Sequence, residues 1–158
     1  MTNYVLKCEG GQINISPMGF LVYAVDFLNA HKSYNSEKPF SPASYYLVCK
    51  SLELSLKAFL LAYGVTRQEI KNQNKLGHDL QKLLQRAIEL NINSVSPISI
   101  VQEQEILKAN YWYARKGFEY FETRNISVSK ETLPDLRMLV EVADRLAVDL
   151  KPLCLSVA

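Results

Sequence analysis

Residues 43–63 of the chain read ASYYLVCKSLELSLKAFLLAY and are followed by Gly64. Placed at steps of about 100° per residue, they form a helix with apolar side chains on two opposite sides. A helix that is apolar on two faces is a central element of a bundle rather than a surface one. The first stripe comprises Cys49, Leu52, Leu56, Phe59 and Tyr63, and the second comprises Leu47, Leu54, Ala58 and Leu61.

The other helices are predicted outward from this one by start signals and apolar periodicity. Serine or threonine residues that can cap a helix stand before the apolar runs, at Ser16, Ser41, Ser99 and Thr132. The patterns predict helices over about 17–31, 79–91, 99–122 and 132–150, with a short turn at 66–69. In the helix from 99, the expected buried stripe is Leu107, Tyr111, Ala114, Phe118 and Phe121. Pro152 is expected to end the last helix.

These elements together predict an all-α fold, an antiparallel bundle of about five main helices in a single domain over residues 1–158. Residues 1–15 are the least helical part of the chain. They are expected to be irregular or to form a short hairpin, because Gly10 and Gly11 can supply the positive φ of a tight turn.

Composition is that of an ordinary globular protein, with 48% hydrophobic and 22% charged residues. The net charge of +2 gives no strong field for nucleic acid or an anionic membrane, although a local basic patch is compatible with it. No stretch is long and apolar enough for a membrane span, and no signal peptide is visible. The three cysteines are widely spaced and indicate neither a disulfide framework nor a zinc site, so a reducing, cytoplasmic location is expected.

Common catalytic signatures are missing from the sequence. It contains no phosphate-binding glycine loop, no HExxH zinc motif and no GxSxG nucleophile elbow. Cys49 and His78 are a cysteine and a histidine that could pair, but Cys49 lies on an apolar stripe and is expected to be an inert core thiol. No metal and no cofactor are expected.

Four polar residues stand out against the apolar pattern. Glu53 and Lys57 are one turn apart in the gap between the two stripes. They form either a structural polar network or a site that contacts a ligand or RNA, since a buried carboxylate needs a cation. His78, in the segment Gly77-His-Asp-Leu80, either caps a helix or joins that site. Arg115 lies off the expected stripe of its helix and can pair with Glu53 or face a phosphate.

These residues carry a resemblance to a known family. Glu53 and Lys57 within the long helix, then Gly77-His-Asp-Leu80, then Tyr113-Ala-Arg115 resemble the HEPN superfamily over about residues 43–121. Its members are small helical bundles of prokaryotic toxin–antitoxin and defence systems. The resemblance implies a bundle that dimerises through its long helices, and a nucleotidyltransferase as one candidate protein partner. In many active members it also implies metal-independent RNA cleavage by an arginine followed four to six residues later by a histidine.

That arginine–histidine spacing does not occur here, because neither His31 nor His78 has an arginine at the required distance before it. The sequence therefore favours a non-catalytic, dimeric HEPN-like module that binds a nucleotide, RNA or a protein through Glu53, Lys57, His78 and Arg115. The alternative is a metal-independent endoribonuclease with an atypical site that uses His78 and Arg115. The sequence leans away from an enzyme but leaves the question open.

Overall fold

A computed structural model describes residues 5–8, 11–34, 40–120 and 133–157 of the chain. Within these ranges the structure is helical apart from one two-stranded hairpin, so the predicted all-α bundle is confirmed. In chain order the elements are β1 (Val5–Cys8), β2 (Gly11–Asn14), α1 (Pro17–Ser33), α2 (Pro42–Ala62), α3 (Arg67–Lys71), α4 (Leu80–Glu89), the 3-10 turn η1 (Ile92–Ser94), α5 (Ile100–Tyr113) and α6 (Leu136–Ser156).

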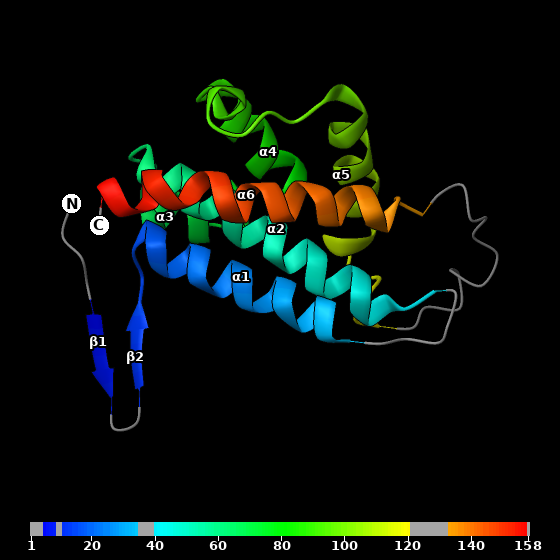
Figure 1. The fold of residues 1–158 in the computed structure, drawn as a ribbon, viewed down its shortest axis with the longest axis horizontal. Coiled ribbons are helices and arrows are strands. Elements are labelled where there is room, and N and C mark those ends of the chain that lie inside the picture. The colour runs from blue at the N-terminus through cyan, green and yellow to red at the C-terminus, as the bar shows by residue number, and fades with distance from the viewer. Residues whose placement is uncertain (1–4, 9–10, 35–39, 121–132, 158) are drawn as a thin grey trace.

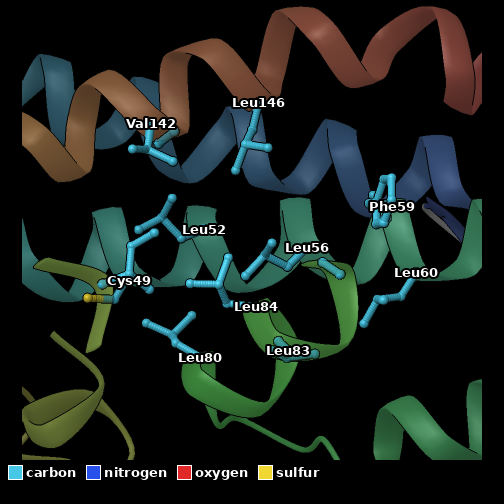
Figure 2. Packing of buried hydrophobic residues seen from close by; sticks show 14 of the residues in the cluster. Cys49, Leu52, Leu56, Phe59, Leu60, Leu80, Leu83, Leu84, Val142 and Leu146 are labelled. Atoms are coloured by element: carbon cyan, nitrogen blue, oxygen red, sulfur yellow. The ribbon is translucent and has the colours of Figure 1, made fainter. Parts of the chain in front are cut away.

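The centre of the bundle is α2, which packs against α1, α4, α5 and α6. Every residue from 51 to 61 is buried, as two opposed apolar stripes require. In Figure 2, Val142 and Leu146 of α6 approach Leu52 and Leu56 from one side, and α4 approaches them from the other. α1 runs opposite to α2, whereas α6 runs beside α2 in the same direction (Figure 1).

Side-chain caps set most of the helix starts. Ser16, Ser41 and Ser99 each accept a hydrogen bond from the backbone N–H three residues ahead, as predicted. The predicted cap Thr132 lies outside the described residues. In its place Asp135 caps α6 by accepting from the N–H groups of residues 137 and 138.

The end of α5 differs from the prediction of a helix to about residue 122, because the helix ends at Tyr113. Lys116 has a left-handed backbone, with φ of 60°. Gly117 N–H donates to the Trp112 carbonyl at 2.7 Å, and Lys116 N–H donates to that of Tyr113 at 3.0 Å. These bonds form a Schellman motif, which turns the chain so that Phe118 stacks on Trp112.

The buried face of α5 also differs from the expected stripe. Leu107 is 41% and Tyr111 59% exposed, while Ile106, Ala109 and Tyr113 are buried. The buried residues Ile106 and Tyr113 lie one position before Leu107 and Ala114 of the expected stripe, so a spacing of three and four residues fits either face. The consequence for function is that Tyr113, rather than Tyr111, points into the bundle.

Pro152 does not end the last helix, because α6 continues to Ser156. Proline removes the hydrogen bond to the carbonyl of Val148. Val148 is 71% exposed, so water can reach that region of the helix surface. One turn of helix beyond Pro152 buries Cys154 completely, which favours continuing the helix over ending it.

Of the two alternatives for the N-terminal segment, the hairpin is present as β1 and β2, paired antiparallel with Val5 opposite Asn14 and Cys8 opposite Gly11. It projects beyond the helices at the start of α1 (Figure 1). Residues 9 and 10, the expected turn, lie outside the described residues. None of the helices in the described ranges combines the length and hydropathy needed to cross a bilayer.

Candidate functional site

The candidate site is built on a carboxylate in the middle of the central helix. Glu53 of α2 has no exposed surface. Lys57, one turn along, donates from Nζ to Glu53 Oε1 at 2.7 Å and is itself buried. Lys50, one turn before, donates to the same oxygen at 3.2 Å. Two lysines on the same helix thus supply the positive charge that a buried carboxylate needs.

Two further partners reach Glu53 from other elements. His78, just before α4, places Nδ1 at 3.0 Å from Oε1 and 3.1 Å from Oε2. Tyr113, at the end of α5, donates its hydroxyl to Oε2 at 2.5 Å. Glu53 therefore joins α2 to the start of α4 and the end of α5, and both of its oxygens are used.

A separate hydrogen-bonded group holds the segment that carries His78. Asp79 caps α4 by accepting from the N–H of Lys82 at 3.1 Å. Asn110 of α5 donates to Asp79 at 3.0 Å and accepts from the N–H of Leu80 at 2.7 Å. The structure thus separates two roles that the sequence left open: Asp79 caps the helix, and His78 turns toward Glu53.

Charge compensation keeps Glu53 ionised in spite of its burial. Burial alone would raise the pKa of Glu53, but the charges of Lys57 and Lys50 and hydrogen bonds from Lys57 and Tyr113 lower it to about 2. Burial, together with the adjacent Glu53 carboxylate, raises the pKa of Tyr113. The Tyr113 hydroxyl therefore remains a neutral donor, and Glu53 remains a carboxylate near neutral pH.

The pKa of the nearby thiol supports the expectation for Cys49. Cys49 is fully buried, and burial followed by the negative charge of Glu53 raises its pKa. A thiol in these surroundings is not a nucleophile at neutral pH.

An open pocket of about 480 Å³ lies over His78. The side chain of His78 is 62% exposed and that of Lys50 is 19% exposed. No described residue bonds to the second ring nitrogen of His78, Nε2. The pocket is lined by Tyr46, Lys50, Gln73, His78, Asp79, Tyr113, Ala114, Lys116 and Glu119.

The wall of this pocket carries two lysines, Lys50 and Lys116, and two carboxylates, Asp79 and Glu119. At the His78 end, Lys50 and Lys57 face the single carboxylate of Glu53, which leaves one positive charge in excess. Asp79, also in the wall, is offset by the N–H groups that it caps and by Lys82, whose Nζ is 3.9 Å away. The His78 end is therefore the part of the pocket suited to an anion.

No ion pair joins Arg115 to Glu53 in the described part of the chain, so of the two alternatives for Arg115 the pairing with Glu53 is not formed. The guanidinium lies 4.0 Å from the centre of the exposed Tyr111 ring. The reason is that the buried face of α5 turns Tyr113 inward, whereas Arg115 lies exposed in the turn that follows the helix. Arg115 lines a second, smaller pocket of about 320 Å³.

Of the four predicted site residues, the structure brings Glu53, Lys57 and His78 together. Their role in binding stays a prediction. Sequence reasoning missed Lys50 and Tyr113. Lys50 carried a usable signal, because it lies three residues before Glu53 on the same helix face. For Tyr113 no comparable signal exists, since its direction depends on which of two equivalent faces of α5 is buried.

Comparison with family models, with curated proteins and with solved structures gave no match for the chain. The resemblance to the HEPN superfamily therefore stays a prediction. Within the described residues, no group of three or more histidine, cysteine, aspartate or glutamate side chains is arranged to hold a metal ion.

Proposed function

We propose that the chain is a non-catalytic, HEPN-like binding module that takes a nucleotide unit of RNA, or a free nucleotide, in the pocket over His78. One observation carries the proposal. The wall of this pocket holds an exposed histidine fixed by a buried carboxylate, in a cluster where lysines outnumber that carboxylate. Such a site is preorganised, because its charged groups are held in place before any ligand arrives.

The size and lining of the pocket suit a nucleotide. A volume of about 480 Å³ lies within the usual range for small-ligand sites. Lys50 provides donors for a phosphate at the end with excess positive charge, and Nε2 of His78 donates to the phosphate when the ring is protonated. Tyr46, in the same wall and 6.1 Å from the ring of Tyr113, offers an aromatic face for a base.

Binding of a fluorescent single-stranded RNA, followed by anisotropy, tests this proposal. Lys50→Gln and Lys116→Gln each remove one positive charge from the pocket wall. We expect each to weaken binding by about tenfold, the effect of losing one charge-assisted hydrogen bond. Lys151→Gln removes the same charge from an exposed position on α6 and is the matched control. Equal affinities for all three variants would refute binding in this pocket.

The second candidate is the metal-independent endoribonuclease, and the contact between Glu53 and His78 favours it. A carboxylate at Nδ1 holds a histidine in the tautomer whose Nε2 can accept a proton, as a general base does. Strand scission by the 2′-hydroxyl needs a proton donor as well. The other histidine, His31, lies on α1 and does not line this pocket. The high pKa of Tyr113 makes its hydroxyl a poor acid.

Incubation with single-stranded RNA in the absence of metal separates the two candidates. We expect no cleavage by the wild type and none by His78→Ala. Cleavage by the wild type that is lost in His78→Ala would establish the endoribonuclease and refute the non-catalytic proposal.

We also propose that the chain forms a homodimer in solution. Nine tyrosines, six phenylalanines and one tryptophan make up 10% of the chain, and aromatic residues are enriched at interfaces. The family resemblance adds the same expectation, with a nucleotidyltransferase as a candidate for a second protein partner.

A further inference from the structure

The second pocket lies directly beside the first. It is lined by Asp79, Gln81, Leu107, Asn110, Tyr111, Ala114 and Arg115. Asp79 and Ala114 belong to both pockets, so the two share a wall at the junction of α4 and α5. A ligand that fills the first pocket and extends past this wall enters the second.

The second pocket carries a flat cationic surface. The Arg115 guanidinium lies 4.0 Å from the centre of the Tyr111 ring, and Tyr111 is 59% exposed. No described residue forms a hydrogen bond or an ion pair with Arg115, so its five N–H donors are open to a ligand. A guanidinium stacked on a tyrosine presents both a planar face for a base and a fork of donors for a phosphate.

The neighbouring polar groups are already engaged. Asn110 donates to Asp79 and accepts from the N–H of Leu80, and Asp79 accepts at the start of α4. These bonds fix the shared wall and leave Arg115 as the free cation of the second pocket within the described residues. The groups available to a ligand are therefore lysine and histidine in the first pocket, and an arginine stacked on a tyrosine in the second.

We propose that the second pocket is a subsite for the adjoining nucleotide, so that the ligand is a single-stranded RNA spanning both pockets rather than a mononucleotide. This inference rests on the proposed function and specifies its ligand class. A single strand is required because bases must leave their stack to lie on exposed aromatic rings. In a duplex the base faces are covered, and the two pockets could receive only the backbone.

The test compares the affinities of uridine monophosphate and a uridine pentanucleotide for the wild type, Arg115→Ala and Arg115→Lys. We expect the pentanucleotide to bind the wild type more tightly than the monophosphate. Arg115→Ala should weaken pentanucleotide binding by about tenfold or more and change monophosphate binding by less than about twofold. Arg115→Lys keeps the charge but loses the planar fork, so its affinity should fall between the two.

Arg137→Ala is the matched control, because it removes the same charge from a side chain that is 88% exposed at the start of α6. It should leave both affinities unchanged. Arg115→Ala should also reduce the dependence of pentanucleotide affinity on salt, since one phosphate contact is lost. Because Arg115 is exposed, its variants should keep the helical circular dichroism of the wild type.

Each of the other outcomes is decisive. Equal affinity for the two ligands, with no effect of Arg115→Ala, would overturn the second subsite and leave the first pocket as the binding site. An equal loss for both ligands in Arg115→Ala would also overturn it, because Arg115 would then act on the first pocket. Failure of the wild type to bind either ligand would refute the proposed function and this inference with it.

Discussion

At the scale of single residues, the chain maintains an ionised glutamate inside its core. Glu53 has no exposed surface, yet Lys50, Lys57, His78 and Tyr113 all direct a polar atom at its carboxylate. Removing one member of such a cluster is costly, because the groups left behind stay buried without a partner. The stability of the fold and the shape of the pocket therefore depend on the same residue.

We predict that Glu53→Ala lowers the free energy of unfolding by about 3–5 kcal/mol, since it leaves the buried Lys57 without its counter-ion. Urea denaturation measures the loss. Glu89→Ala is the control, because Glu89 pairs with Arg86 on the surface, where such a pair contributes less than about 1 kcal/mol. A loss for Glu53→Ala no greater than the control's would show that the cluster does not stabilise the fold.

We predict that the ionisation of Glu53 makes the free energy of unfolding depend on pH. Its pKa is about 2 in the folded chain, against an ordinary value of 4.5, so the folded state binds fewer protons than the unfolded state between these values. Stability from this group is complete above the higher pKa and is lost as the pH falls toward the lower one, by on the order of 3 kcal/mol. Urea midpoints measured from neutral to acidic pH should show this decline. The decline should be markedly smaller in Glu53→Gln, and an identical decline in both proteins would contradict the assignment.

At the scale of elements, the position of His78 depends on the turn before α4. Gly77 has φ of 46°, and a Cβ there would lie 2.8 Å from the backbone Cα of Gln73. Gly64, after α2, has φ of 84° but open space around the position of its Cβ. The two glycines therefore share a left-handed backbone and differ in crowding.

We predict that Gly64→Ala costs about 1–2 kcal/mol, the strain of a left-handed backbone, and leaves RNA binding unchanged. Gly77→Ala should cost more, because the backbone must also move away from Gln73, and it should weaken RNA binding by displacing the adjacent His78. Thermal unfolding and RNA anisotropy on both variants check the pair. Equal RNA affinities would show that His78 is not positioned by this turn.

The elements also show what the sequence could predict. The pattern of α2 was sufficient to predict a central helix and to single out Glu53 and Lys57, because both signals lie within one helix. The end of α5 and its buried face were not predictable in this way. They depend on packing between elements, namely the turn that stacks Phe118 on Trp112 and the bonds that tie Asn110 to the start of α4.

At the scale of the whole molecule, the proposed homodimer has a direct test. Sedimentation velocity at micromolar concentration should show a species with twice the mass of the chain. A monomer alone at these concentrations would contradict the proposal, and it would leave the pocket over His78 as a site within one chain.

The proposed pocket is tested most directly by NMR of the two histidine side chains during titration with single-stranded RNA. The chain has only His31 and His78, so His78→Ala assigns both. His31 lies on α1, outside the residues that line the pocket, and is an internal control. We predict that the ring resonances of His78 shift and saturate with the RNA while those of His31 stay fixed. Binding of RNA that leaves His78 unmoved, or no binding at all, would contradict the proposed site.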